Sequence, residues 1–259
     1  MAEKDNINQP KALIEATPEE VQKLDTQVEP QVYRRKSREE LDKEAHAAEL
    51  AAWVPKTALG RAVREKKITH FDDILAKNLK VLEAPVVDLL LRTEHDLLLI
   101  GQAKGKFGGG KRRAWRQTQK KTMEGNVVTF SAMAVVGDKA GHVGLGLGKA
   151  KETLPARAKG LRAAKLNMIK VTRGWESKEV GTQPHTVPYK VTGKCGSVRI
   201  TLIPAPRGTG LVIGNEGKKI LRLAGIEDVY SYVEGQTRTT FNLGKAVINA
   251  LTKTNTLKL

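Results

Sequence analysis

The sequence predicts an α+β protein in which a helical N-terminal arm precedes two mixed units of helices and strands. Capping boxes, in which Ser or Thr is followed three residues later by Glu, mark helix starts in the arm. Beyond the arm, strand-sized apolar runs rich in β-branched residues alternate with segments of helical periodicity. A chain of 259 residues is long enough for one large or two modest domains. We therefore expect an arm at 1–55, a first domain at 56–172, a linker at 173–184 and a second domain at 185–259.

The arm is acidic, whereas the rest of the chain is strongly basic. Residues 1–55 carry 8 basic and 12 acidic side chains, and the remainder carries 37 basic and 16 acidic ones. Capping boxes at Thr17–Glu20 and Ser37–Glu40 predict a short helix to about Val28 and a second helix through Ala52. Neither helix has an apolar face wide enough to bury alone. The arm is therefore expected either to fold onto a partner or to remain a disordered solubilising tail.

The first domain is predicted to open with helices and to continue with strands. Two short helices are expected within Lys56–Asn78. Their predicted buried positions are Leu59, Val63, Phe71, Ile74 and Leu75. The apolar runs Val86–Arg92 and Leu97–Gln102 have the length of strands, and a basic, glycine-rich loop is expected over 104–125.

A hairpin and a helix are expected to complete the first domain. Asn126–Val136 is a predicted strand, 137–141 its turn and His142–Gly148 the returning strand. Glycines alternate along that returning strand and share one face, so this face must admit another backbone. A helix is expected at Lys149–Ile169, with a buried stripe at Leu154, Leu161 and Met168 and basic residues that include Arg157 and Arg162. Three strands followed by a basic helix are similar to the double-stranded-RNA-binding fold, which reads backbone shape rather than sequence.

The second domain is predicted to begin at His185–Val191 and to alternate strands with helices. Strands are expected at Ser197–Ile203 and Asp228–Val233, and helices at Asn215–Ala224 and Thr240–Thr252. In the last helix one face gathers the apolar residues Leu243, Ala246, Val247, Ala250 and Leu251. That face is expected to be buried.

The strongest functional signal is a basic run between Leu97 and Met123 that contains no acidic residue. Its bases are Lys104, Lys106, Lys111, Arg112, Arg113, Arg116, Lys120 and Lys121. Binding such a segment to a polyanion releases condensed counterions, and Phe107 and Trp115 could stack on bases. A solvated tail or a localisation signal is the alternative, but the run lies between two apolar segments. We therefore expect contact with nucleic acid.

A second glycine-rich segment, Gly208–Ile220, admits several interpretations. A P-loop is excluded because Val212 and Lys219 stand where that motif needs Gly and Ser or Thr. A dinucleotide fingerprint needs a strand directly before it, and a KH loop needs a helix, yet prolines precede this segment. What remains is a tight turn before a helix, flanked by Arg207, Lys218 and Lys219. Such a turn could hold a phosphate or pack against a neighbouring protein.

Several classes of protein are excluded by composition. The single Cys195 allows neither an internal disulfide nor a cysteine-rich zinc site, and the five histidines lack metal-ligand spacing. No nucleophile or metalloprotease motif is present, so we expect no enzyme, no cofactor and no small-molecule substrate. No apolar run approaches the ~18 residues that span a bilayer. We expect a cytoplasmic protein without a membrane partner.

Six segments, which occur in one order along the chain, resemble the small-ribosomal-subunit protein five family. They are Thr129–Lys151, Pro184–Pro188, Lys194–Val198, Leu202–Gly210, LAGIEDVY and FNLGKAVINAL. The forms PHTVP and LIPAPRGTG resemble the archaeal and eukaryotic branch rather than the bacterial one. The chain stops soon after the last predicted helix, without the eukaryotic C-terminal extension, and we therefore expect the archaeal branch.

The resemblance implies a structural protein of the ribosome, whose second domain has a left-handed βαβ crossover. In the family, a hairpin loop that corresponds to Gln119–Gly125 penetrates small-subunit (16S-type) rRNA. Arg207, Gly208, Thr209 and Gly210 match the family's contact with ribosomal protein four, which affects decoding accuracy. Because bacteria have Glu where this chain has Arg207, an ion pair inferred from bacteria is not expected to carry over. The protein is expected near the channel through which messenger RNA enters, among other small-subunit proteins.

The basic residues and the family resemblance together predict one RNA-binding interface. The residues expected to bind RNA are Lys104, Lys106, Lys111, Arg112, Arg113, Arg116, Lys120, Lys121, Arg157, Arg162, Lys218 and Lys219. Two competing hypotheses are a free regulator that binds double-stranded RNA and a phosphate-handling enzyme built on the second domain. The enzyme would require a carboxylate–lysine pair beside the glycine turn.

Overall fold

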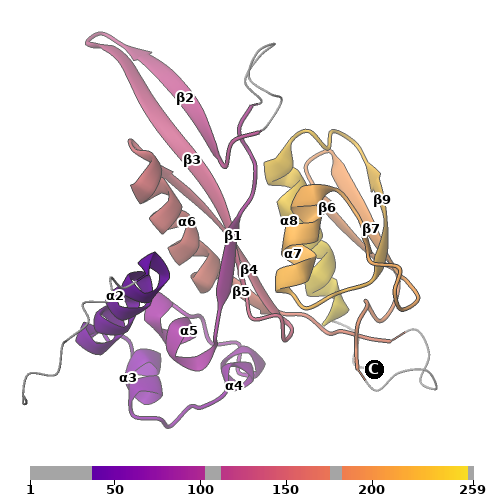
Figure 1. The fold of residues 1–259 in the computed structure, drawn as a ribbon, viewed down its shortest axis with the longest axis horizontal. Coiled ribbons are helices and arrows are strands. Elements are labelled where there is room, and N and C mark those ends of the chain that lie inside the picture. Colours follow the sequence, from indigo (N-terminus) through magenta and orange to yellow (C-terminus); the bar gives the residue numbers. More distant parts are fainter. Residues whose placement is uncertain (1–36, 103–111, 176–182, 256–259) are drawn as a thin grey trace, which may run out of the picture. The chain divides into compact units, whose positions relative to one another are not determined.

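The computed structural model describes residues 37–102, 112–175 and 183–255 (Figure 1). The chain divides into two compact units, residues 1–51 and 52–259. Helix α2 (Arg38–Ala52) begins at the predicted capping box, where Ser37 N donates to Glu40 Oε2 at 2.8 Å and Glu40 N donates to Ser37 Oγ at 3.3 Å. This helix is confirmed. The helix predicted after Thr17 lies outside the described residues.

Three short helices open the larger unit: α3 (Ala58–Arg64), α4 (Phe71–Ala76) and α5 (Ala84–Leu90). The first two confirm the helices expected within Lys56–Asn78. Of their predicted core residues, Val63, Phe71 and Ile74 are buried, and Leu59 and Leu75 are half-buried.

The prediction of a strand at Val86–Arg92 is wrong, because Val86–Leu90 belong to helix α5 and the two residues that follow are in neither a helix nor a strand. Pro85 lies in the first turn of α5, where its missing N–H breaks no helical hydrogen bond. Val86 and Val87 are fully buried. A short apolar run fits a buried helix as well as a buried strand, so periodicity alone could not separate the two.

The first sheet is antiparallel, with strand order β1-β3-β4-β5, and β2 pairs along the outer part of β3. Its strands are β1 (Glu94–Leu97), β2 (Trp115–Thr122), β3 (Gly125–Gly137), β4 (His142–Ala150) and β5 (Met168–Lys170). The predicted hairpin of β3 and β4 is confirmed.

Two predictions about the first sheet require correction. The strand expected at Leu97–Gln102 instead lies at Glu94–Leu97, because beyond it the Leu99 amide leaves the sheet and donates to Glu216 Oε2 at 2.7 Å. The loop expected over 104–125 contains strand β2. A basic run is compatible with a strand here, because its charged side chains are exposed along a ribbon paired on one side only.

Helix α6 (Thr153–Leu166) packs on the glycine face of β4. A Cβ at Gly144, Gly146 or Gly148 would overlap backbone atoms of α6, which confirms the predicted close approach. The predicted stripe is wrong: Leu154 is 72% exposed, Leu161 is half-buried, and the buried Met168 lies in β5. The buried face instead consists of Ala156, Gly160 and Ala164, because the short distance to β4 leaves room only for small residues.

The second sheet has the order β6-β7-β9-β8, in which β8 is parallel to β9 and the other neighbours are antiparallel. Its elements are β6 (Val191–Cys195), β7 (Val198–Pro204), β8 (Leu211–Val212), α7 (Asn215–Leu223), β9 (Val229–Glu234) and α8 (Thr240–Thr254). Apart from β6 and the two-residue β8, these elements match the predicted ones within two residues. The apolar face predicted for α8 is buried throughout.

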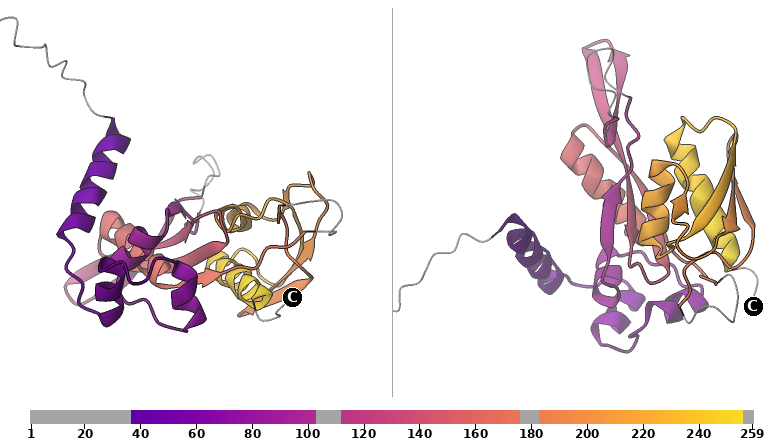
Figure 2. Two further views of the ribbon diagram at one scale, coloured as in Figure 1. Left: turned by 90° about the horizontal axis from the view of Figure 1, so that it is seen from below. Right: turned by 45° about the vertical axis from the view of Figure 1, so that its right-hand side comes forward.

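Helices α7 and α8 lie between the two sheets and join them through one hydrophobic core (Figures 1 and 2). Leu98, Met133 and Val135 of the first sheet region belong to the same buried cluster as Ile220 and Val247 of these helices. Gly174 forms an antiparallel bridge with Thr186, and the Arg173 guanidinium donates to Ala140 O at 2.9 Å. The regions expected as two domains therefore share a hydrophobic core.

Candidate nucleic-acid interface

The outer part of the β2–β3 hairpin extends beyond the rest of the first sheet (Figure 1). Residues 125–129 of β3 pair only with β2, whereas pairing with β4 begins at Phe130. Met123 at the tip is fully exposed and Val127 is exposed. The two strands are joined by a hydrogen bond between the Thr118 and Thr129 hydroxyls, at 2.8 Å. This ribbon has no hydrophobic core of its own, and a lone two-stranded ribbon is only marginally stable in water.

Exposed basic side chains line the hairpin and the segment that leads into it. Arg112, Arg113, Arg116, Lys120 and Lys121 are all exposed, and within the described part of the chain none of them makes an ion pair. Glu124 is the one acidic residue of the hairpin sequence 115–137. Uncompensated cations on a projecting ribbon produce a positive potential that attracts a polyanion. Lys104, Lys106 and Lys111 lie outside the described residues.

Trp115, at the base of the hairpin, is held by two arginines. The guanidinium carbons of Arg157 and Arg113 lie 5.0 and 6.0 Å from its ring centroid, within the range of cation–π interactions. Arg157 comes from α6, so this stack connects the hairpin to the helix below it. The predicted RNA-binding residue Arg157 is thereby half-buried against Trp115, whereas Arg162 on the same helix is exposed.

The predicted pair Lys218 and Lys219 separates in the structure, because consecutive residues of a helix point about 100° apart. Lys219 Nζ lies 3.1 Å from Asp96 Oδ1 and donates to Leu97 O at 2.7 Å. Lys219 therefore links α7 to β1. Lys218 is half-buried and lines a cavity on the other side.

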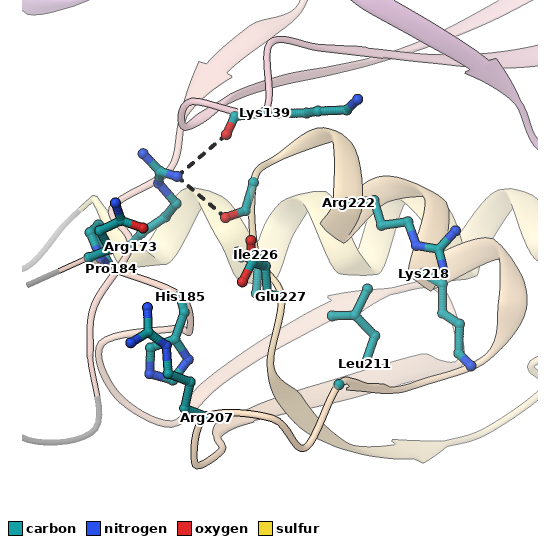
Figure 3. Close-up of a pocket in the computed structure, with 13 residues that line it drawn as sticks. Lys139, Arg173, Pro184, His185, Arg207, Leu211, Lys218, Arg222, Ile226 and Glu227 are labelled. Carbon is teal, nitrogen blue, oxygen red and sulfur yellow. Dashed lines mark hydrogen bonds between the residues drawn. The ribbon is translucent and has the colours of Figure 1, made fainter. Parts of the chain in front are cut away.

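That cavity, of about 620 Å³, lies beside the Arg207–Gly210 turn (Figure 3). Arg207, Lys218 and Arg222 line it, and the Arg173 guanidinium caps carbonyls at its edge. The turn needs glycine, since φ is 87° at Gly208 and 72° at Gly210. Gly210 N donates to Asp228 Oδ1 at 2.7 Å, which holds the turn against the second sheet. The four residues expected to contact a protein thus form a fixed, outward-facing turn.

A second cavity, of about 420 Å³, brings together Arg112, Arg116 and Arg238 at the start of α8. Arg238 is not among the residues predicted from the sequence. A signal was present: Arg238 directly precedes Thr239 and Thr240, residues typical of a helix start. Its position beside the basic run could not be inferred, because the two lie more than 120 residues apart in the chain.

A separate cluster of titratable residues lies at the inner end of the first sheet. His142 Nδ1 lies 2.6 Å from Asp138 Oδ2, and its Nε2 lies 2.8 Å from Asp72 Oδ1. Burial alone would lower the pKa of His142, but hydrogen bonds to Asp138 and then Asp72 outweigh it and raise that pKa. Burial alone would raise the pKa of Asp72 and of Asp138. Hydrogen bonds to Lys170 and His142 nevertheless lower the pKa of Asp72, and hydrogen bonds to His142 lower that of Asp138. The cluster holds α4 against the β3–β4 turn and β5.

Two further kinds of site are absent from the described residues. No group of His, Cys, Asp and Glu there has an arrangement that could hold a metal ion. None of the described helices combines the length and apolarity that crossing a membrane requires.

Comparison with known proteins identifies the family. Residues 111–172 match the family model of the N-terminal domain of ribosomal protein S5, and residues 193–258 match that of its C-terminal domain. The small ribosomal subunit protein uS5 of Nanoarchaeum equitans is 46% identical over 209 residues, which cover 80% of this chain and 90% of that protein. The uS5 proteins of Aeropyrum pernix and Pyrobaculum calidifontis are 43% and 44% identical, over 82% of this chain and 91% and 98% of theirs.

These relatives are archaeal, which agrees with the archaeal and eukaryotic branch that the forms PHTVP and LIPAPRGTG predicted and with the expectation of an archaeal protein. The three are at least 43% identical over about four fifths of the chain, and the family models fall on both sheets of the larger unit. The chain therefore belongs to the uS5 family of small-ribosomal-subunit proteins, a structural and non-enzymatic family.

Proposed function

We propose that the chain is an rRNA-binding scaffold of the small ribosomal subunit and that the β2–β3 hairpin is its principal RNA contact. One observation carries this proposal: a ribbon without a core of its own presents Arg116, Lys120 and Lys121, none of which has an ion-pair partner among the described residues. Phosphates would replace the counterions of these side chains. RNA packed around the ribbon would also supply the contacts that its own strands lack.

The RNA interface extends from the hairpin toward its base. Arg112, Arg113 and Arg162 are exposed and contribute further cations, and Lys218 lies beside the Arg207 turn. Lys104, Lys106 and Lys111 belong to the proposal by their charge and their place in the basic run. Arg157 and Lys219 act within it as supports, because Arg157 packs on Trp115 and Lys219 pairs with Asp96.

We also propose a specific position for the chain within the small subunit. The Arg207–Gly210 turn contacts ribosomal protein four, and the protein supports messenger-RNA entrance and translational accuracy. The open space around Gly208 and Gly210 favours a protein contact at this turn, because no atom outside the turn lies within 4 Å of a Cβ built there. For the fold, we propose that the first sheet with α6 is of the double-stranded-RNA-binding type and that β8–α7–β9 is a left-handed crossover. The parallel pairing of β8 with β9 supports such a βαβ unit.

Sedimentation of a native lysate tests the scaffold function. The chain should migrate with small subunits in near-equimolar amount at moderate salt. A light, free pool that binds duplex RNA would instead identify a free double-stranded-RNA-binding regulator and would contradict the scaffold function.

A further inference from the structure

Helix α8 begins at a cavity where arginines from distant parts of the chain converge. Arg112 lies just before β2, Arg116 is the second residue of that strand, and Arg238 comes from the connection between β9 and α8. The cavity measures about 420 Å³, and the described residues that line it include no carboxylate. Within the described residues none of the three guanidinium groups makes an ion pair.

The location of these arginines is electrostatically unfavourable in the absence of an anion. The N-terminus of a helix carries the positive end of the helix dipole, so cations are normally favoured at the other end. Helix α8 is 15 residues long, and its first turn contains no acidic residue. Three positive charges at this helix start therefore point to a negative ligand.

Hydrogen-bond donors at the same place lack acceptors. The Thr239 side chain makes no capping hydrogen bond, and the Phe241 N–H has no acceptor among the described residues. Thr240 lines the cavity and is only 4% exposed, yet within the described chain its hydroxyl has no hydrogen-bond partner. Thr240 Oγ1 is not among the side-chain atoms that are sealed from solvent without a partner, so this hydroxyl opens onto the cavity and is free to donate to a ligand there, which is a second, independent indication of a ligand.

The packing of the chain holds the two sides of this cavity together. Gly101 N donates to Arg113 O at 2.9 Å, and a Cβ at Gly101 would overlap the Trp115 carbonyl. Glycine at this position therefore lets the segment after β1 lie directly against the start of β2. Arg112 and Arg116 are fixed beside α8 as a result.

We propose that this cavity binds one phosphate group of the rRNA backbone. The Thr240 hydroxyl and the Phe241 N–H donate to its oxygens, and Arg112, Arg116 and Arg238 neutralise its charge. The site adds the C-terminal region to the RNA interface, so that the chain contacts RNA both at the hairpin and at the start of α8. This inference rests on the proposed rRNA-binding function.

Arg238→Gln in the full chain tests the site, because Arg238 lies outside the hairpin and the basic run. We expect affinity for small-subunit rRNA to fall about five- to tenfold at ~0.1 M salt, and the salt slope of log K to decrease by about 0.9, as for one lost phosphate contact. Lys190→Gln is the matched control. Lys190 is exposed and follows Tyr189, whose hydroxyl donates to Lys253 O at the opposite end of α8. This variant should leave the affinity and the slope unchanged.

Thr240→Val separates a ligand-binding role from a packing role. Valine removes a hydroxyl that has no hydrogen-bond partner among the described residues and keeps a similar shape, so thermal unfolding of the free chain should occur at about the same temperature. Affinity for rRNA should nevertheless fall about fivefold, because a hydrogen bond to a charged phosphate is lost. Unchanged affinity in this variant would overturn the assignment of the hydroxyl to the phosphate.

The remaining outcomes distinguish this inference from the proposed function. An unchanged salt slope in Arg238→Gln, combined with a lower slope in the Lys120→Gln/Lys121→Gln variant, would overturn the site and leave the function standing. Unchanged slopes in both variants would overturn both proposals. If Arg238→Gln kept its rRNA affinity but lost another small-subunit protein from reconstituted particles, the ligand would be an acidic protein segment, and the phosphate assignment would be wrong.

Discussion

The two halves of strand β3 share a backbone conformation but have opposite surroundings. The inner half, Phe130–Gly137, pairs with β4, and most of it is buried beneath α6 and against α7. The outer half, Gly125–Thr129, pairs only with β2 and is largely exposed. Apolar side chains and glycine contacts hold the inner half, whereas cations without ion-pair partners among the described residues surround the outer half.

The difference separates stability from binding along one strand. Burial of apolar surface, as in the inner half, is the dominant favourable contribution to folding. The outer half buries little, so its side chains can change without loss of the fold. Substitutions in the inner half should therefore affect stability first, and substitutions of the basic β2 residues that pair with the outer half should affect RNA binding alone.

Gly146→Ala should have the largest effect on stability. A Cβ at this position would overlap Ala164 N and Gly160 O of α6, so strand and helix must separate. We expect a loss of about 3 kcal/mol in the free energy of unfolding, measured by chemical denaturation. Gly214→Ala is the control, since its φ is negative and no atom outside the turn lies within 4 Å of the added Cβ. It should cost less than about 1 kcal/mol, and equal losses in the two variants would contradict the packing account.

His142→Gln should have a smaller, pH-dependent effect at the inner end of the sheet. The pKa of His142 is raised above 6.5, so its contribution is full below about pH 6.5 and is lost as pH rises through the folded-state pKa. The lowered pKa values of Asp72 and Asp138 act oppositely: their contributions are present above about pH 3.8 and disappear as pH falls.

The variant should therefore lose about 1–2 kcal/mol near pH 6 and less at higher pH. Denaturation of both proteins across this range measures the difference. A difference that stayed constant from pH 6 to above the raised pKa would show that His142 acts through packing rather than charge.

Trp115→Leu should lower the stability of the region where the inner and outer halves of β3 meet. Trp115 pairs with Ala132 in the sheet register and contacts the guanidinium groups of Arg157 and Arg113. We expect a loss of about 1 kcal/mol in unfolding free energy. Trp115→Phe retains an aromatic face and should recover part of this loss. If phenylalanine and leucine behaved alike in denaturation, cation–π contacts would not contribute.

Sequence patterns predicted the elements whose side chains carry a clear period. The apolar face of α8 repeats at helical spacing, and alternating glycines in β4 predicted the close approach of another backbone. Val86 and Val87 were assigned to a strand because a short apolar run carries no decisive period. Leu154 is exposed because the glycine face selects small residues, a requirement that only the packed pair of elements reveals.

The sequence predicted which basic residues belong to the candidate site, but it did not predict how they are arranged in space. The sequence identified Lys120 and Lys121 but placed them in a loop, because pairing of β2 with β3 depends on both strands. Lys219 was grouped with the RNA-binding residues, although its partner Asp96 lies far away in the sequence. Arg238 was missed for the same reason. Contacts between distant segments are set by tertiary packing, which local patterns do not encode.

The most direct test of this account compares Lys120→Gln/Lys121→Gln with the wild-type chain in rRNA binding and thermal unfolding. The matched control is Lys77→Gln/Lys80→Gln, which removes two exposed lysines from the connection between α4 and α5. We predict that the hairpin variant unfolds at the wild-type temperature and that its salt slope for small-subunit rRNA decreases by about 1.8, as for two phosphate contacts. The control should keep both values. An unchanged slope in the hairpin variant, or an equal decrease in the control, would contradict the claim that the hairpin carries the RNA contact.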